Sequence, residues 1–301
     1  VDYTHPDLVG NIWINQGEIP EWMEEAGLDG GSDGYIDAYE VIDFLIMQGI
    51  DNNFDGQIDL RDIVSSGSPF EDGIDNDSNG YVDDLIGWDP AGQWGTDDND
   101  PFPQIDAANG GAWPHGPHVA GILSATTDNG IGMASTSFNG KIISIKASRD
   151  DGTTDPGIYN GYDGILYAAK AGYYSGGFTI INASWGGGGY SFSEQSVINV
   201  CHDTYGAVVV ASAGNGANWG DEYTSNYPGS YDNVISVCAV GCNGDWGGWA
   251  TYHPSVDLAA PGENVFSAII GSGYEMWDGS SMAGPNAASC IGLLAAYYPE
   301  M

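Results

Sequence analysis

Apolar residues after position 115 fall into short continuous runs that are separated by longer segments of helical character. The runs span residues 142–147, 178–184, 207–213, 233–240 and 264–269. Continuous rather than alternating apolarity is typical of parallel strands that are covered on both faces. Helical segments around residues 156–172 and 191–205 lie between the runs. We therefore expect an α/β fold, with helices flanking a mostly parallel central sheet.

Two further helices are predicted to begin at side chains that can carry out nucleophilic chemistry. His115 opens one helical segment in HGPHVAG, and Ser281 opens another in GSSMAGP. A helix start presents free backbone N–H groups and the positive end of the helix dipole to developing negative charge. A serine becomes a useful nucleophile at neutral pH only beside a base. The sequence therefore predicts a nucleophile and a base, provided that the fold brings the two together.

Polar residues also mark the ends of two predicted strands. Ser184 and Asn215 fall at the carboxyl ends of the second and third apolar runs. In α/β folds the active groups gather at this edge of the sheet. We expect both residues near the site.

The segment from about residue 10 to residue 110 is acidic and rich in Gly, Asn and Asp. Within it a template recurs with starts at residues 29, 51 and 75, and this spacing indicates a repeated structural unit. Each copy has oxygen donors at positions 1 and 5, Gly at position 6 and an aliphatic residue at position 8, as in EF-hand calcium loops. The candidate Ca²⁺ ligands are Asp29, Asp33, Asp37, Glu40, Asp51, Asn53, Asp55, Gln57, Asp62, Asp75, Asp77, Asn79 and Tyr81.

Position 12 distinguishes the three loops. It holds Glu40 in the first loop, the shorter Asp62 in the second and the apolar Ile86 in the third. A carboxylate at this position binds Ca²⁺, so we expect the first two loops to bind it best. Residues 20–25 and 41–48 are predicted to form helices around the first loop. The pair of loops also resembles dockerin modules, so a protein partner is an alternative to a purely stabilising role.

The charge balance narrows the possible partners. The chain has 42 acidic residues against five Lys and Arg, a formal net charge of −37. Nucleic acid is excluded as a partner because phosphate contacts require Lys and Arg. A salt-adapted surface and carboxylates gathered around cations both explain the acidity. The sequence shows neither a membrane span nor a signal peptide. The four cysteines allow three disulfide pairings if all are oxidised, but buried thiols are favoured because all four lie in or beside apolar segments.

With these blocks the chain resembles a subtilisin-like serine peptidase of the subtilase family. HGPHVAG is similar to the family's histidine block and GSSMAGP to its nucleophile block. The resemblance implies the three-layer subtilisin-like fold, with His115 as general base and Ser281 as nucleophile. The segment AGN that ends at Asn215 is similar to the family's oxyanion-hole segment, which implies that Asn215 binds the oxyanion.

Two more segments imply contacts with a peptide substrate. Residues 182–187 are similar to the family's substrate-binding strand, which pairs with an extended peptide and here contains Ser184, Trp185 and Gly186. The resemblance puts Asn226 near the base of the specificity pocket. Because no acid stands at that position, we expect no trypsin-like preference.

The first residues, VDYTHPDL, match the segment on the carboxyl side of the family's catalytic Asp block. The resemblance thus implies a catalytic Asp three residues before Val1, and a calcium ligand at Asp7 near Asp128. We expect residues 1–301 to be a partial peptidase domain that lacks its first strand and its C-terminal end, with an acidic insertion over residues 10–110. Such a chain would be inactive or impaired by itself.

The parent protein is expected to be a secreted, monomeric, calcium-stabilised endopeptidase that acts on polypeptides. The alternative is a catalytically dead subtilase that serves as a calcium-dependent binding module. Three departures from the family blocks bear on this choice: Pro117, Ser280 and residues 286–289. Proline is tolerated in the first turn of a helix, and Asn286, expected to be buried, would need a hydrogen-bond partner.

Overall fold

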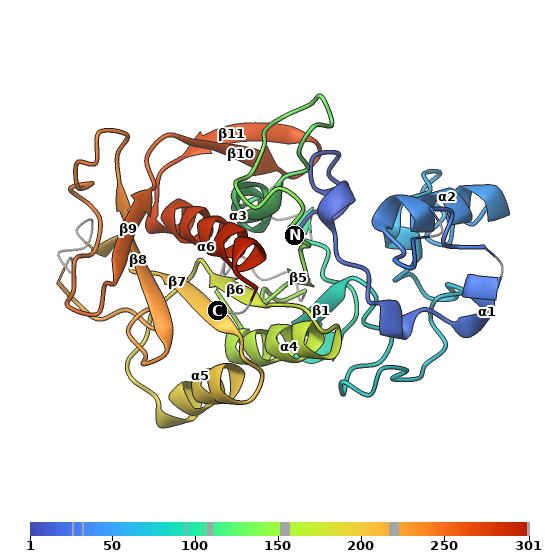
Figure 1. The fold of residues 1–301 in the computed structure, drawn as a ribbon, viewed down its shortest axis with the longest axis horizontal. Helices are drawn as coiled ribbons and strands as arrows, with labels where there is room; N and C mark the ends of the chain where they lie inside the picture. Colours follow the sequence, from blue (N-terminus) through green and yellow to red (C-terminus); the bar gives the residue numbers. More distant parts are fainter. Residues whose placement is uncertain are drawn as a thin grey trace.

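A four-stranded parallel sheet forms the centre of the molecule (Figure 1). The structure is a computed structural model and describes residues 1–25, 27–31, 33–93, 95–103, 105–106, 111–150, 157–216 and 223–299. The strands, in the order in which they pair, are β6 (Ile180–Ala183), β7 (Val208–Ser212), β8 (Val234–Val240) and β9 (Leu258–Pro261). Three of the predicted apolar runs are thereby confirmed as parallel strands, whereas β9 was not predicted.

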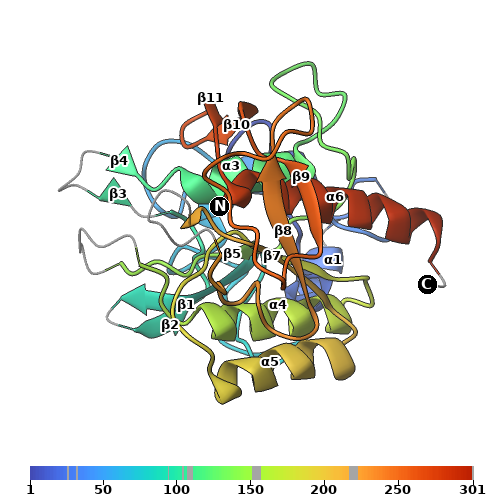
Figure 2. The same ribbon diagram turned by 90° about the vertical axis from the view of Figure 1, so that its left-hand side faces the viewer.

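Helices cover both faces of this sheet (Figure 2). On one face lie α4 (Gly161–Tyr174) and α5 (Phe192–Asp203), which confirm the two predicted helical segments. The first of them begins later than expected, because residues 157–160 are not helical and residue 156 is outside the described residues. On the other face lie α3 (His115–Ser124) and α6 (Ser280–Tyr297). The alanines of α6 pack on valines of β7 and β8, and these small side chains allow close approach. The predicted α/β class, a parallel sheet flanked by helices, is confirmed.

A second sheet continues the layer beyond β6 but is not hydrogen-bonded to it. In it β1 (Gly87–Gln93) pairs in parallel with β5 (Ser144–Ile145) and antiparallel with β2 (Thr96–Asp98). The run predicted over residues 142–147 is therefore a strand of only two residues. Nothing in the sequence GWDPAGQ indicates β1, because it contains Pro, Gly and polar residues that strands disfavour.

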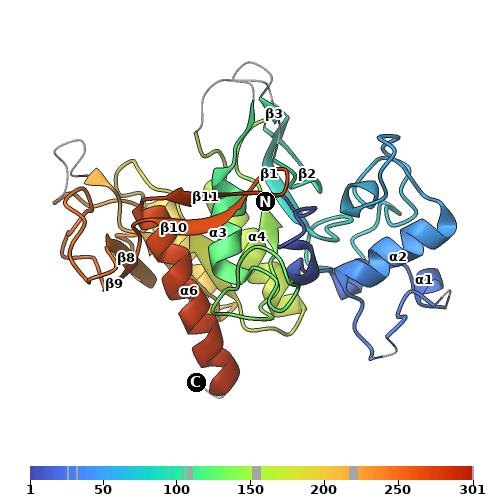
Figure 3. The ribbon, with the colours of Figure 1, turned by 90° about the horizontal axis from the view of Figure 1, so that it is seen from above.

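The prediction for residues 264–269 is wrong in its pairing. These residues form β10 (Val265–Ile269), which makes an antiparallel hairpin with β11 (Gly273–Trp277) above α3 (Figure 3). Gly271 and Ser272 adopt positive φ angles of 76° and 69° and close the hairpin. Apolarity alone predicted a strand there but not its partner. A second small hairpin pairs β3 (Ile105–Asp106) with β4 (Gly111–Ala112).

The part of the acidic segment that precedes β1 forms a lobe at one side of the molecule, drawn in blue in Figure 1. It contains α1 (Glu21–Glu25) and α2 (Ala38–Gln48), both predicted, and three short 3₁₀ helices at Val9–Asn11, Gln16–Glu18 and Leu60–Asp62. Asp37 begins α2 with a capping box, because its side chain accepts from the Glu40 N–H while Glu40 accepts from the Asp37 N–H. The lobe shares one apolar core with Tyr3 and Leu8 of the chain's first residues.

Two smaller expectations have mixed outcomes. Cys201 and Cys238 are buried, but Cys242 and Cys290 are exposed, so the expectation of four buried thiols is wrong for the latter pair. Asn286 has the partners that it needs, because its Nδ2 donates to the carbonyls of Pro261 and Met282 at 3.0 and 3.1 Å. No helix in the described ranges is long and apolar enough to span a bilayer.

Packing of α3 on the β10–β11 hairpin depends on a glycine. A Cβ at Gly121 would lie 2.3 Å from the Ser267 Oγ. We predict that Gly121→Ala lowers the free energy of unfolding by about 1–3 kcal/mol. Gly292→Ala in α6 is the matched control, since its Cβ would meet only ordinary contacts at 3.5 Å or more. There the helix propensity of alanine should stabilise by up to about 1 kcal/mol. Urea unfolding measures both, and equal effects would contradict the packing argument.

Candidate active site

The first turns of α3 and α6 meet at one cleft. Its volume is about 470 Å³, and its lining includes His115 from α3, Ser281 from α6 and Asn215 from the loop after β7. Trp277 and Met276 of β11 form another wall. The structure thus brings together the three predicted catalytic residues, which lie far apart along the chain.

Ser281 is anchored to the end of β6. Its Oγ donates to the Ser184 carbonyl at 3.2 Å, and the Ser184 Oγ donates to the Ser281 carbonyl at 2.8 Å. Among the hydrogen bonds that the described residues form, none uses the Ser281 backbone N–H. An N–H group in the first turn of a helix has no intrahelical partner and is available to an anion.

Asn215 is oriented by Ser280. Its Oδ1 accepts from the Ser280 N–H and from the Ser280 Oγ, both at 2.9 Å. Because an N–H can only donate, the oxygen must face Ser280, and Nδ2 is the opposite end of the amide. The Ser280 hydroxyl also accepts from the Gly214 N–H at 3.2 Å. Sequence reasoning treated Ser280 only as a departure from the family block, although its place beside the nucleophile was a signal that it could act on the site.

His115 is exposed to solvent at the start of α3, beside the Trp277 ring. Trp277 lies nearly parallel to it at 6.3 Å and stacks closely on His118 at 4.4 Å. Desolvation of the imidazole lowers the pKa of His115, and the nearby His118 lowers it further. In the described part of the chain no carboxylate is hydrogen-bonded to this imidazole or contributes to its shift. A neutral imidazole is the form that accepts a proton.

The residues predicted to bind substrate border the same region. A Cβ at Gly186 would lie 2.2 Å from the Asn226 Nδ2, so glycine permits this close approach. The next residue, Gly187, donates from its N–H to the Tyr227 carbonyl at 2.9 Å. Ser184 and Gly186 therefore lie near Ser281 and Asn226 respectively. The Trp185 ring packs edge-on against Tyr162, 5.4 Å away, and lines a different cavity.

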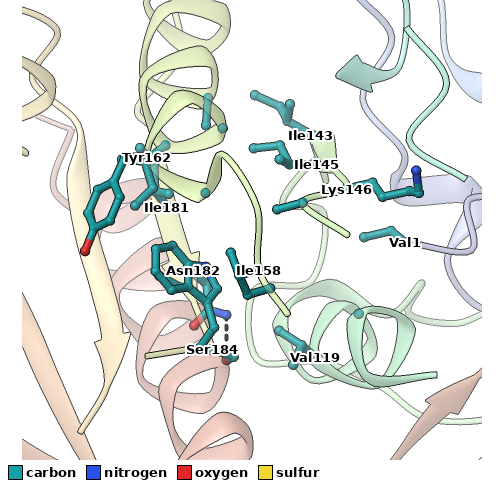
Figure 4. Close-up of a pocket in the computed structure, with 18 of the residues that line it drawn as sticks. Val1, Val119, Ile143, Ile145, Lys146, Ile158, Tyr162, Ile181, Asn182 and Ser184 are labelled. Atoms are coloured by element: carbon teal, nitrogen blue, oxygen red, sulfur yellow. Dashed lines mark hydrogen bonds between the residues drawn. The ribbon is translucent and has the colours of Figure 1, made fainter. Parts of the chain in front are cut away.

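That cavity, of about 1770 Å³, separates the two sheets (Figure 4). Ile143 and Ile145 line it beside β5, while Ile181 and Asn182 line it from β6. The buried Asn182 Oδ1 has no hydrogen-bond partner among the described residues. Val1 lies at its edge, and burial lowers the pKa of its α-amine to about 6. The sheet is therefore interrupted beside the site.

The first two acidic loops contain oxygens that suit a hard cation. In each, one carboxylate oxygen of position 1 accepts from the N–H of the position-6 glycine: Asp29 from Gly34 at 3.0 Å and Asp51 from Gly56 at 3.1 Å. The other oxygen, Oδ1 in both, is buried and has no hydrogen-bond partner in the described parts of the chain. Orphaned carboxylate oxygens surrounded by further oxygen donors fit Ca²⁺.

Other predicted ligands have competing roles. Asp37 caps α2, and Asp55 pairs with Arg61 at 2.6 Å. In the third loop, the Tyr81 ring packs against Tyr167 at 4.7 Å. The remaining candidate positions within the loops show these contacts: Asp33 Oδ1 accepts from the Tyr35 N–H, Asn53 Oδ1 from the Asp55 N–H, Asp77 Oδ1 from the Asn79 N–H and Asn79 Oδ1 from the Tyr81 N–H, while the Gln57 N–H donates to Asp55 Oδ1.

Asp7, expected to be a calcium ligand near Asp128, contacts the segment that follows Asp128. It is fully buried, and it accepts from the Asn129 Nδ2 at 2.8 Å and from the Met133 N–H at 2.9 Å. Asp128 adopts a positive φ of 63° in the turn before Asn129.

The chain is similar to a known protein family and to individual proteins. The profile of the subtilase family (Peptidase_S8) matches residues 1–301. Thermitase of Thermoactinomyces vulgaris is 36% identical over 206 residues, which are 68% of this chain and 67% of that protein. A thermophilic serine proteinase of Bacillus sp. (strain AK1) is 35% identical over 182 residues, 60% of this chain but 42% of the relative.

Among solved structures, the fold is similar to a protease from Pseudoalteromonas arctica PAMC 21717. The TM-score is 0.57 at 28% sequence identity, and the match covers 71% of this chain and 72% of that one. The chain thus spans two thirds of thermitase and less than half of the Bacillus proteinase.

The lowered pKa of His115 predicts the midpoint of its titration. Because the pKa in the folded chain lies below the usual 6.5, the unfolded chain binds a proton first as pH falls. The contribution of this group to stability is therefore present above pH 6.5 and is lost as pH falls from 6.5 through the lower folded pKa. NMR of the imidazole C–H signals, assigned with His115→Gln, should give a midpoint below 6.5. A midpoint above 6.5 would reveal a carboxylate partner within this chain.

Proposed function

Because the chain belongs to the subtilase family, we propose that it forms the catalytic core of a serine endopeptidase. His115 takes the proton of the Ser281 hydroxyl, and the oxygen attacks the scissile carbonyl of a polypeptide. The observation that supports this proposal most strongly is the single cleft lined by His115, Ser281 and Asn215.

Oxyanion stabilisation falls to two N–H donors. One is the Ser281 backbone N–H, which no protein acceptor in the described chain uses, and the other is the Asn215 Nδ2, whose orientation Ser280 fixes. Both would strengthen their hydrogen bonds as the carbonyl oxygen becomes negative. The proton then passes from His115 to the leaving amine, and water hydrolyses the acyl-enzyme by the reverse steps.

The substrate backbone would pair with the segment after β6. Residues 184–187 follow that strand next to Ser281, and Gly187, whose Cβ position has nothing within 4 Å, leaves room for an added strand. The position itself holds the amide Asn226 and not a carboxylate, so the proposal includes no preference for basic residues.

We also propose that the carboxylate partner of His115 is supplied by a strand preceding Val1. Three observations support this. The cavity between β5 and β6 is lined by apolar side chains of both sheets, the Val1 nitrogen lies 3.7 Å from the Cβ position of Gly116, and no described carboxylate reaches His115. A strand in this cavity would pair with the edges of both sheets and end beside the imidazole.

Calcium is proposed to stabilise the acidic lobe, through its carboxylates and the orphaned oxygens of Asp29 and Asp51. When bound, the ion would neutralise clustered negative charge in a chain of net charge −37. Calcium in the extracellular range loads loops of modest affinity, so we propose that the parent protein is secreted.

A fluorophosphonate reagent tests the proposed activity. The chain extended by its natural upstream sequence should be labelled, and Ser281→Ala should abolish labelling completely because the attacking oxygen is gone. Asn215→Ala should slow labelling by about 10²–10³-fold, since one oxyanion donor is lost. Peptide cleavage should rise on the order of 10⁴-fold when the upstream segment is present. A folded parent that resists labelling would favour the binding module instead.

Calcium removal tests the metal proposal. Chelation should lower the melting temperature by several degrees, because each site loaded at 100 times its Kd adds about 2.7 kcal/mol. The control is NaCl at matched ionic strength, since screening alone reduces repulsion in so acidic a chain. If NaCl restores the melting temperature as fully as CaCl₂, a salt-adapted surface explains the acidity and the calcium proposal fails.

A further inference from the structure

The three acidic loops share one pattern of hydrogen bonds around a carboxylate. In the first loop, the Glu40 carboxylate at position 12 accepts from the N–H groups of Gly31 and Asp37, at positions 3 and 9. In the second, Asp62 at position 12 accepts from Asn53 and Asp59, again at positions 3 and 9, and from position 2. The carboxylate of the twelfth residue thus connects the first part of the loop, at position 3, to its last part, at position 9.

The third loop has no carboxylate at position 12, because Ile86 stands there and is fully buried. A glutamate from a distant part of the chain makes the same contacts. The Glu18 Oε1 accepts from the N–H groups of Asn76 and Asp77, positions 2 and 3, at 2.8 and 3.1 Å. Its Oε2 accepts from the N–H of Asp83, position 9, at 3.1 Å.

We infer that Glu18 takes the place of the missing twelfth residue and completes a Ca²⁺ site in the third loop. The inference rests on the proposed role of calcium, and it names a ligand that lies before all three loops in the sequence. Carboxylate oxygens of Glu18, Asp75 and Asp77 all lie within 4.8 Å of one another. Within the described ranges, the carboxylates of the first two loops do not form such a group.

Two carboxyl groups at the cluster are buried without an ion-pair partner among the described residues. Glu18 is 1% exposed, and Asp84, which Asn79 Nδ2 links to Asp77 of the cluster, is fully buried. None of the ion pairs among the described residues involves the four carboxylates of Glu18, Asp75, Asp77 and Asp84. Burying carboxylates without a counter-charge is costly, and a divalent cation removes that cost.

Two neighbouring side chains indicate how the cluster is enclosed. The Tyr167 hydroxyl on α4 is fully buried and lies toward Asp84 without a hydrogen bond of standard geometry. Lys170 on the same helix donates to the Asn79 carbonyl at 3.2 Å and lies over the Tyr81 ring, but contacts none of the four carboxylates. A buried hydroxyl without a hydrogen-bond partner is costly. Binding of an ion would rearrange the nearby carboxylates and let the Tyr167 hydroxyl find a partner among them.

The position of this site gives it a structural consequence. Glu18 belongs to the 3₁₀ helix near the start of the lobe, whereas residues 75–83 lie near its end. Tyr81 packs on Trp88 of β1 at 5.1 Å and on Tyr167 of α4 at 4.7 Å. Calcium here would therefore tie both ends of the lobe to the α4 side of the central sheet. The expectation that the third loop is the weakest site counted only residues within the loop.

Equilibrium dialysis with ⁴⁵Ca²⁺ on the full chain tests the assignment. Glu18→Gln keeps the size and one hydrogen-bond acceptor but removes the charge, so we expect it to lose one bound Ca²⁺ or at least 10-fold in affinity at one site. Glu40→Gln should lose a different site, and the double variant should lose both. Glu71→Gln, half-buried and outside the loops, controls for the loss of one negative charge. Circular dichroism confirms that each variant is folded.

Hydrogen exchange on the unsubstituted chain gives a readout that does not depend on any variant folding. Ca²⁺ should slow exchange in residues 15–19 and in residues 75–83 together, at one common concentration. Protection of 75–83 without 15–19, or a folded Glu18→Gln that binds the same number of ions with the same affinities, would overturn the role of Glu18. An unsubstituted chain that binds no Ca²⁺ would instead overturn the calcium proposal as a whole.

Discussion

The structure depends on one packing arrangement: α3 and α6 lie against each other on the same face of the parallel sheet. Their first turns thereby meet at the carboxyl edge of β6 and β7. A glycine at position 121 lets β10 approach α3, and the Ser267 hydroxyl of β10 donates to the His118 carbonyl at 2.6 Å. Small side chains on α6 seat that helix closely on β7 and β8. Two residues far apart in the sequence thus share one cleft.

The two halves of the site, around Ser281 and around His115, differ in their hydrogen bonds. Around Ser281 the side chains have hydrogen-bond partners: Ser184, just after β6, bonds to the nucleophile, and Ser280 fixes Asn215, while the Ser281 N–H remains available. Among the described residues, none forms a hydrogen bond that orients the His115 imidazole. The lowered pKa of this group favours its neutral form. The cavity beside it interrupts the sheet at the same place. The proposed strand between β5 and β6, with a carboxylate at its end, would account for both the missing partner of His115 and the cavity.

The sequence predicts the parts of this account that depend on local pattern. Continuous apolar runs predict β6, β7 and β8, and the helical segments around residues 156–172 and 191–205 predict α4 and α5. Family blocks give His115, Ser281 and Asn215, which the fold brings to one cleft.

Contacts between distant segments could not be predicted in this way. β1 is formed by residues that disfavour strands, so its pairing with β5 and β2 explains it. The partner of β10 depends on a hairpin closed at Gly271 and Ser272, which an apolar run does not reveal. Glu18 lies 57 residues before the loop that it contacts, so no spacing rule within the loop can include it.

The central claim is that the imidazole of His115 and the hydroxyl of Ser281 act as one unit. A crystal structure of the protein with its upstream segment measures this directly as the distance from the His115 Nε2 to the Ser281 Oγ. The account predicts about 2.6–3.2 Å, which is proton-transfer range, with a carboxylate at Nδ1. A separation too long for a hydrogen bond, with the cavity between β5 and β6 filled by something other than a strand, would contradict it.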